Sequence, residues 1–139
     1  MKKNEAVTRI MSSNPVSVGR NETVSAARKM LEEKGIHHLP ITDGKVLVGI
    51  ITSNDFLRVS FGEFGNQDAR NLDAILDHTY KIADLMNPNV TTINKDQTVR
   101  DAATILATSG FHSLPVVDGD NLVGIVTSSD LIQYLLDQY

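Results

Sequence analysis

The 139-residue chain contains no cysteine, which excludes disulfide bonds, thiolate metal ligands and a cysteine nucleophile. It also lacks any apolar run near the roughly 20 residues that a membrane-spanning helix needs. Its first residues, Met1-Lys2-Lys3-Asn4-Glu5, are not followed by the apolar core of a signal peptide. We therefore expect a cytoplasmic protein that does not interact with membranes.

An excess of basic residues is missing as well. The formal net charge is −4, whereas broad nucleic-acid binding needs a basic footprint, so we expect no nucleic-acid partner. An anionic ligand would have to be held by local groups such as helix N-termini, histidines or single Arg and Lys side chains. Apolar residues make up 41% of the chain and charged residues 22%, which is typical of a globular protein.

Familiar catalytic motifs are a third absence. The chain has no Gly-x-Ser-x-Gly elbow, no P-loop and no His-Glu-x-x-His helix. Serine, histidine and aspartate are all present, so a small hydrolytic enzyme stays an alternative. The polar residues described below occur in duplicate, however, which fits two equivalent binding sites better than one asymmetric reaction centre. We predict that this chain is not an enzyme.

The most informative feature that is present is a repeat with a constant offset of 75 residues. Residues 35–55 are matched by residues 110–130, and the register holds without a gap from positions 11 and 86 onward. A self-match of this length predicts two copies of one structural unit. Each copy has too little core to stand alone, so we expect the two copies to pack their sheets together.

Within each copy the residue patterns predict the order β-α-β-β-α. Residues 6–11 and 81–86 are expected to form one or two helical turns, and residues 16–18 and 90–93 to form short strands. The next helix should begin after an N-cap threonine, Thr23 or Thr98, and end at a left-handed glycine, Gly35 or Gly110.

The second half of each copy predicts a β-hairpin followed by a helix. Residues 39–42 and 46–51 are joined by Asp43-Gly44, a strong signal for a tight turn, and the second copy repeats this pattern. Pro40 and Pro115 cannot donate to a ladder and belong at a strand start or on an edge.

The expected fold is therefore an α+β fold of α/β type, with two β-α-β-β-α repeats packed with pseudo-two-fold symmetry. Repeat 1 covers residues 1–57, a connector with a short helix covers 58–80, and repeat 2 covers 81–139. The connector contains Phe61 and Phe64, followed by apolar residues at helical spacing. It either covers an edge of the core or forms a partner-binding or lid segment.

Each copy ends in the pattern Thr-x-x-Asp, as Thr52 with Asp55 and as Thr127 with Asp130. A Thr followed three residues later by an acid is a capping-box pattern. The same geometry suits a nucleotide, because a helix N-terminus and a hydroxyl attract phosphate and a carboxylate can accept both hydroxyls of a ribose. On the residues alone, both interpretations stand.

Histidines and single basic residues are the other repeated polar groups. His37 and His112 hold the same place in both copies, and His38 follows the first of them. A His pair can bind a metal, but adjacent side chains diverge and no cysteine assists, so we expect no metal site. Arg20 and Lys95 also match, either as surface charges or as phosphate contacts.

This doubled unit, in which each copy ends in Gly-aliphatic-x-Thr-x-x-Asp, resembles the cystathionine-β-synthase (CBS) domain family over about residues 7–57 and 82–132. The resemblance implies a tandem pair, often called a Bateman module. Such a pair binds an adenine nucleotide (AMP, ADP or ATP) or S-adenosylmethionine as a regulatory ligand in clefts between the copies. The resemblance implies no obligatory cofactor. We therefore expect a sensor that signals to a partner protein.

The resemblance also implies roles for individual residues. The two motifs would hold ribose and phosphate, the histidines would reach the phosphates, and backbone near the first strand would read the purine edge. Related modules often have Arg after the histidine, and its absence here predicts phosphate affinity that is weaker or pH-dependent. The expected ligand-binding residues are Thr52, Asn54, Asp55, Thr127, Ser129, Asp130, His37, His38, His112, Val16, Thr91, Arg20 and Lys95.

Two predictions concern assembly. The pseudo-two-fold axis predicts crossed sites, in which Asp55 works with His112 and Asp130 with His37. The terminal helix, residues 131–136, carries more apolar surface than a monomer of this size should expose, and modules of the family commonly pair, so we predict a homodimer. A structural dimerisation module without ligand is the remaining alternative.

Overall fold

A computed structural model describes residues 4–59 and 69–139, which form two compact units. The central unit is the continuous segment Val16–Val90, and the terminal unit joins Met1–Pro15 to Thr91–Tyr139. Both units mix helices and strands, and the two repeats follow the predicted order, so the predicted fold class is confirmed. None of the helices in the described ranges is long and apolar enough to cross a membrane.

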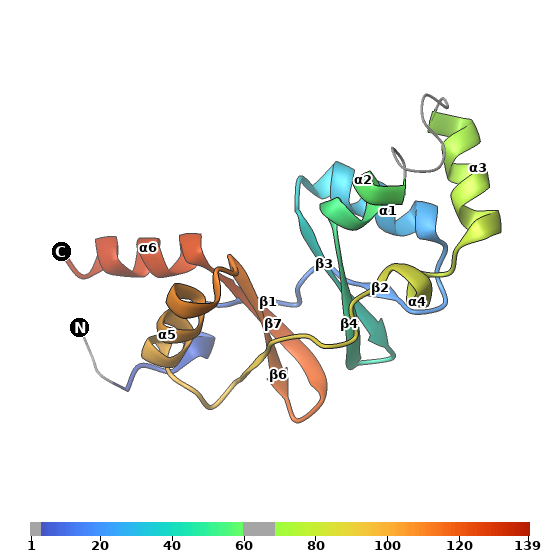
Figure 1. Ribbon diagram of the computed structural model, residues 1–139. Coiled ribbons are helices and arrows are strands. Elements are labelled where there is room, and N and C mark those ends of the chain that lie inside the picture. The colour runs from blue at the N-terminus through green and yellow to red at the C-terminus, as the bar shows by residue number, and fades with distance from the viewer. Residues whose placement is uncertain (1–3, 60–68) are drawn as a thin grey trace. The chain divides into compact units, whose positions relative to one another are not determined.

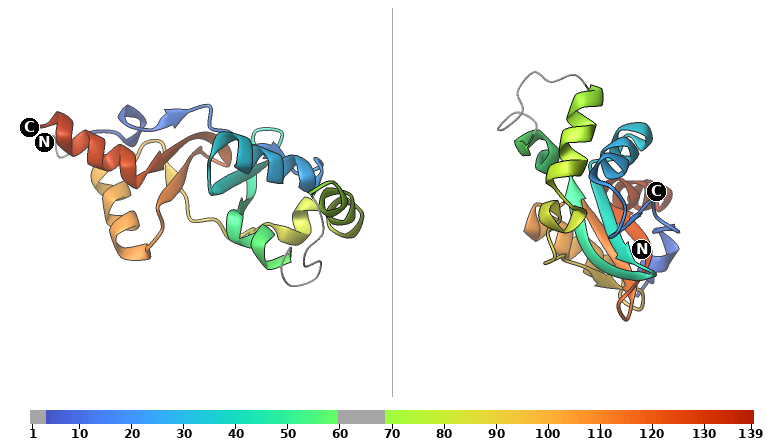
Figure 2. Two further views of the ribbon diagram at one scale, coloured as in Figure 1. Left: turned by 90° about the horizontal axis from the view of Figure 1, so that it is seen from above. Right: turned by 90° about the vertical axis from the view of Figure 1, so that its right-hand side faces the viewer.

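The central unit places short helices against a small sheet (Figures 1 and 2). Strand β2 runs parallel to β3, and β3 runs antiparallel to β4. Leu39, Ile41 and Ile51 from this sheet are fully buried in a core that includes Leu31 and Leu76 from the covering helices. In chain order the elements are β2 (Val18–Gly19), α1 (Val24–Lys34), β3 (His38–Asp43), β4 (Val46–Thr52), α2 (Ser53–Val59), α3 (Ala69–Thr79) and α4 (Ile82–Leu85).

The terminal unit repeats this arrangement with the second copy. Strand β5 runs parallel to β6, β6 runs antiparallel to β7, and β1 adds to β7 in antiparallel orientation. Leu114, Val116 and Val126 are fully buried in its core. The elements are η1 (Val7–Arg9), β1 (Ser12–Ser13), β5 (Ile93–Asn94), α5 (Val99–Ser109), β6 (Ser113–Asp118), β7 (Asn121–Thr127) and α6 (Ser128–Asp137).

The segment that leads into each copy packs with the other copy. Val7 belongs to the lead-in of the first copy, yet it is fully buried in the core of the terminal unit, and its N–H donates to the Gln97 carbonyl over 2.9 Å. In the central unit, Ile50 and Asn87 exchange backbone hydrogen bonds of 3.0 and 2.8 Å. The compact units therefore have different boundaries from the sequence repeats.

The predicted helix ends are confirmed. Thr23 accepts from the N–H of Ala26, and Thr98 forms a capping box with Asp101. Gly35 and Gly110 are left-handed, with φ of 63° and 78°.

The strands predicted at residues 16–18 and 90–93 are wrong in extent, because β2 and β5 begin later. The parallel register pairs Val18 with Ile41, so the preceding residue, Ser17, faces Pro40, which has no N–H to donate. Pro115 limits β5 in the same way. Both prolines stand third in their strands rather than at the start, at the point where the parallel neighbour has not yet begun.

The helix of the connector, α3, covers the central core. Leu76 is fully buried there, and the Ser25 N–H and hydroxyl donate to the Asp77 carboxylate over 2.8 and 2.6 Å. Phe61 and Phe64 lie outside the described residues, so the lid alternative is not tested.

A bidentate ion pair also joins α3 to α1. Arg28 donates to both oxygens of Asp73 over 2.6 and 2.9 Å, and the two side chains are 22% and 19% exposed. This contact raises the pKa of Arg28, chiefly through the hydrogen bond to Asp73. The pair therefore favours the folded position of α3.

Replacing Asp73 with alanine is expected to lower the free energy of unfolding by about 1–3 kcal/mol, because Arg28 would keep its partly buried charge without that partner. Urea denaturation measures this change. The matched control is Glu32→Ala, which removes a 3.0 Å partner of the same guanidinium that is itself 72% exposed, and which should cost under about 1 kcal/mol. Equal losses would contradict a special role for Asp73.

The capping box of α5 predicts a response to acid. Hydrogen bonds from the Thr98 backbone and hydroxyl lower the pKa of Asp101 below its ordinary value of 3.8. A depressed folded-state pKa contributes stability that is present above pH 3.8 and lost as the pH falls through the folded-state pKa. Asp101→Asn should therefore have a lower free energy of unfolding than the parent protein near neutral pH, and this difference should shrink below about pH 4. Urea denaturation at a series of pH values measures it. A difference that stays constant with pH would contradict this prediction.

Candidate functional site

The two Thr-x-x-Asp motifs lie at the junctions where β4 passes into α2 and β7 passes into α6. In the central unit the ladder pairs Thr52 with His38, which brings the start of β3 next to the motif. The Ser53 N–H donates to the His37 carbonyl over 3.0 Å, and His37 Nδ1 lies 3.3 Å from Ser53 Oγ. The structure therefore brings His37, His38 and the first motif together at one end of the hairpin.

The terminal unit has the corresponding junction. Thr127 pairs with Ser113 in the ladder, and the Ser128 N–H donates to the His112 carbonyl over 2.9 Å. Ser53 and Ser128, which contact the histidines, were not predicted as site residues. They are identical at the 75-residue offset, and that identity is the signal that could have found them.

In the second motif the capping interpretation is confirmed. The Thr127 N–H donates to Asp130 Oδ2 over 2.8 Å, and the Asp130 N–H donates to Thr127 Oγ1 over 3.1 Å. Among the described residues, Asp130 Oδ1 has no hydrogen bond or ion pair. Capping therefore uses one carboxylate oxygen and leaves the other available to a ligand.

The first motif differs in charge. Both the Thr52 N–H and its hydroxyl donate to Asp55 Oδ2, over 2.8 and 3.1 Å. The second oxygen, Oδ1, lies 3.6 Å from Arg58 Nη2, and the two side chains are 20% and 68% exposed respectively. Asp55 therefore forms an ion pair, whereas Asp130 forms none with any residue that the structure describes.

Four of the other predicted site residues lie at or near the starts of helices and strands. Asn54 and Ser129 are exposed in the first turns of α2 and α6. Val16 is half-buried and Thr91 is exposed, each just before the short first strand of its copy.

Arg20 and Lys95 lie apart from the motif of their own unit. Arg20 pairs with Asp43 over 3.4 Å, and Lys95 pairs with Asp118 over 3.3 Å. These acids end β3 and β6, at the opposite end of each strand from the histidines. Exposed ion pairs account for both basic residues without a ligand.

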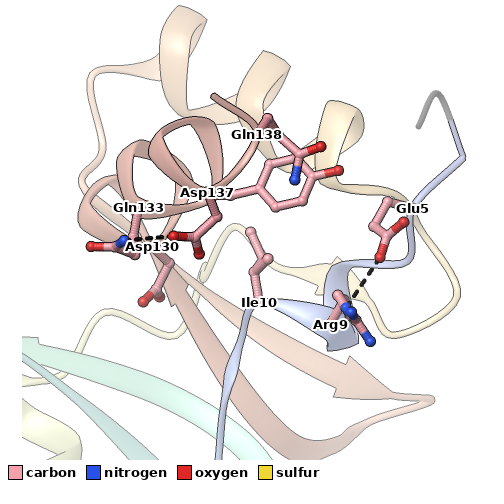
Figure 3. A pocket seen from close by; sticks show the side chains of 8 residues that line it. Glu5, Arg9, Ile10, Asp130, Gln133, Asp137 and Gln138 are labelled. Carbon is pink, nitrogen blue, oxygen red and sulfur yellow. Dashed lines mark hydrogen bonds and ion pairs between the residues drawn. The ribbon is translucent and has the colours of Figure 1, made fainter. Parts of the chain in front are cut away.

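Two pockets adjoin these residues. The pocket of the central unit has a volume of about 850 Å³ and is lined by His37, Ser53 and Asn54 together with apolar side chains that include Leu57 and Leu72. The pocket of the terminal unit, of about 380 Å³, is lined by Asp130 and by charged and amide side chains of α6 and the N-terminal segment (Figure 3). Within the described ranges, His, Asp and Glu do not gather in threes that could hold a metal ion.

Comparisons with family models and with solved structures both match this chain to CBS domains. The family model of the CBS domain matches residues 7–62 and 82–137. The chain is similar to the solved structure of CBSX2 in complex with AMP, at 27% identity and a TM-score of 0.79, over 96% of this chain and 98% of that one. It is also similar to the CBS domain pair of protein MJ0100 in complex with 5′-methylthioadenosine and S-adenosyl-L-methionine, at 30% identity and a TM-score of 0.74, over 96% and 98%.

Curated relatives differ in length from this chain. A CBS domain-containing protein of Dictyostelium discoideum is 32% identical over 94% of this chain and 90% of its own length. The chain spans only 33% of an uncharacterised protein of Methanocaldococcus jannaschii that is 28% identical over 97% of the chain. It spans only 22% of a homoserine O-acetyltransferase of Methanocorpusculum labreanum that is 31% identical over 88% of the chain.

Proposed function

The chain belongs to the CBS domain family, and from this we propose that it is a regulatory module that binds an adenosyl ligand and signals to a partner protein. The ligand class is an adenine nucleotide (AMP, ADP or ATP) or S-adenosylmethionine. This chain would bind the ligand without transforming it. We also propose a cytoplasmic location, as the sequence analysis expects.

The observation that carries the proposal is the duplicated Thr-x-x-Asp junction. Asp130 keeps one carboxylate oxygen without a partner among the described residues, at a strand-to-helix junction that also holds Ser128 and His112. A carboxylate can accept hydrogen bonds from both hydroxyls of a ribose. Related pairs of nearly the same length were solved with AMP and with S-adenosyl-L-methionine, which supports this ligand class.

The signalling half of the proposal rests on the longer relatives. The chain matches only a fraction of several proteins, one of which is named as an acetyltransferase, so the same module occurs beside other domains. Ligand binding would change which surface of this module is available to a partner protein, or the conformation in which that surface is held.

A thermal-shift panel with AMP, ADP, ATP and S-adenosylmethionine tests the binding half. A ligand that binds only the folded chain should stabilise it by about 2.7 kcal/mol at 100 times its dissociation constant, which raises Tm by several degrees. At least one of the four should do so. If none does at millimolar concentration, the structural dimerisation alternative is favoured instead.

We also propose a homodimer formed through α6. Ile132, Leu135 and Leu136 are 59%, 41% and 62% exposed on this helix, and burying them would remove apolar surface from water. Light scattering is expected to give a dimer at tens of micromolar, and Ile132→Asp combined with Leu136→Asp should give a monomer that is still folded. A parent protein that is monomeric with and without nucleotide would rule this out.

A further inference from the structure

Two methionines, Met11 and Met86, stand at equivalent positions in the lead-in segments of the two copies, and each packs against a glycine of β7 or β4. In the central unit, Met86 Sδ lies 2.5 Å and its Cγ 2.9 Å from the point where a Cβ on Gly49 would stand. In the terminal unit, Met11 fills the same place at Gly124. Each thioether therefore occupies a slot that exists only because the strand has no side chain there.

Each slot adjoins the place where a lead-in segment is attached to its unit. Ile50 and Asn87, the residues that follow Gly49 and Met86, exchange backbone hydrogen bonds of 3.0 and 2.8 Å. In the terminal unit, β1 begins directly after Met11 and runs antiparallel to β7. The two thioethers also pack against the buried cores of their units. A change at either sulfur therefore acts on the attachment of a lead-in segment.

The thioethers are the only sulfur groups of the chain, which contains four methionines and no cysteine. Met11 and Met86 are half-buried, so neither side chain is fully withdrawn from solvent. Met30 is half-buried as well, but it lies within α1 and outside both attachments. It therefore provides an internal comparison for the effect of oxidation.

Hydrogen peroxide converts a methionine thioether to the larger and polar sulfoxide. The sulfur lone pair attacks one peroxide oxygen, the O–O bond breaks, and the hydroxide that leaves takes the remaining proton from the new S–O group to form water. Sulfur is oxidised by two electrons and the peroxide is reduced. The product is a thioether that carries one additional oxygen atom.

The slots suit the thioether better than the sulfoxide. The carbonyl oxygens of Asn87 and Ser12 lie 3.2 and 3.0 Å from the Cβ points of Gly49 and Gly124, so backbone oxygen lines both slots. A sulfoxide oxygen carries a partial negative charge that these carbonyls repel, and a closely packed site has no spare volume for it. Oxidation should therefore drive the side chain out of its slot.

We propose that Met11 and Met86 are a pair of peroxide-sensitive modification sites, at which oxidation to the sulfoxide releases the lead-in segment of each copy. In the reduced protein the thioether holds the segment against its strand. Release in the terminal unit loosens the segment that carries Val7 into the core. Neither site needs a bound ligand for this response.

Hydrogen exchange of the full chain before and after treatment with hydrogen peroxide tests this proposal, with peptide mass spectrometry to measure oxidation at each methionine. Oxidation of Met86 should raise the exchange rates of the Ile50 and Asn87 amides at least about tenfold. Oxidation of Met11 should do the same for the amides that pair β1 with β7. Treatment with methionine sulfoxide reductases should restore the original rates.

Leucine variants identify the sulfur that is responsible. Met86→Leu keeps a similar volume and has no thioether, so its Ile50 and Asn87 amides should keep their protection in peroxide. The matched control is Met30→Leu, which should respond to peroxide at these amides as the parent protein does. Equal protection of both variants in peroxide would contradict the assignment to Met86.

A glycine variant should reproduce the oxidised state without an oxidant. In Gly49→Ala the new Cβ would displace the Met86 thioether, so exchange at the Ile50 and Asn87 amides should rise at least about fivefold. The matched control is Gly19→Ala, because the nearest atom to a Cβ there is 3.8 Å away. This control should leave both amides unchanged.

Two results would overturn the proposal. If Met11 and Met86 are oxidised while the exchange rates beside them stay the same, the sulfoxide fits the slot and holds the segment as the thioether does. If both methionines stay reduced in peroxide that oxidises free methionine, the sulfur atoms are not modification sites.

Discussion

Val7→Asp is expected to unfold the terminal unit while the central unit stays folded. Val7 is fully buried in the core that contains Leu114 and Val126, although it lies more than a hundred residues before them in the sequence. A buried carboxylate without a partner costs about 3–5 kcal/mol, which is a large part of the stability of a small domain. The whole terminal unit is therefore expected to unfold, which is more than the loss of one contact.

Amide hydrogen exchange followed by region is the measurement. Protection in β6 and β7 should collapse, whereas protection in β3 and β4 should stay close to that of the parent. The matched control is Thr8→Asp, which adds the same charge at the exposed neighbouring position and should cost under about 0.5 kcal/mol. If β3 and β4 lose protection and β6 and β7 do not, the lead-in segment supports its own copy and the unit boundaries are wrong.

The sequence predicts the local parts of this fold because their signals are local. Thr98 with Asp101 predicts a capping box, and Gly35 and Gly110 predict left-handed helix ends, since each depends on a few neighbouring residues. The 75-residue offset doubles the evidence for every such element. The structure confirms these features.

The exchange of lead-in segments could not be predicted in the same way. Val7 has the same apolar character whether it packs against β3 or against β6, and no periodicity reports which sheet it joins. The late start of β2 is different, because the parallel register places Ser17 opposite Pro40 and only the observed pairing reveals that conflict. Non-local pairing therefore limits the sequence-based description.

The candidate site shows the same division. The Thr-x-x-Asp pattern predicts the observed cap at Asp130, but a cap and a ribose contact need the same residues, so the pattern cannot separate them. The Arg58–Asp55 contact and the pocket beside Asp130 each bring together side chains that lie three or more residues apart in the sequence. The difference between the two motifs therefore appears only in the structure.

Removal of either motif aspartate is expected to weaken adenosyl-ligand binding at one site at least tenfold. A carboxylate that accepts from a sugar diol makes charge-assisted hydrogen bonds worth about 1.5–3 kcal/mol each. The matched control is Asp101→Ala, which removes a capping aspartate of the same geometry at a position with no predicted ligand role. Urea denaturation then compares the stability of the three variants, which separates loss of a helix cap from loss of a ligand contact.

Double variants decide which histidine works with which aspartate. The crossed arrangement predicted from the repeat pairs Asp55 with His112, so Asp55→Ala combined with His112→Ala should damage one site and leave the other intact in calorimetry. Within the central unit, His37 instead lies beside Ser53, two residues before Asp55, which offers an uncrossed alternative. In that case Asp55→Ala with His37→Ala would spare one site, and the crossed pair would damage both. If neither aspartate affects binding, the motif serves only as a helix cap and the adenosyl-binding proposal loses its main support.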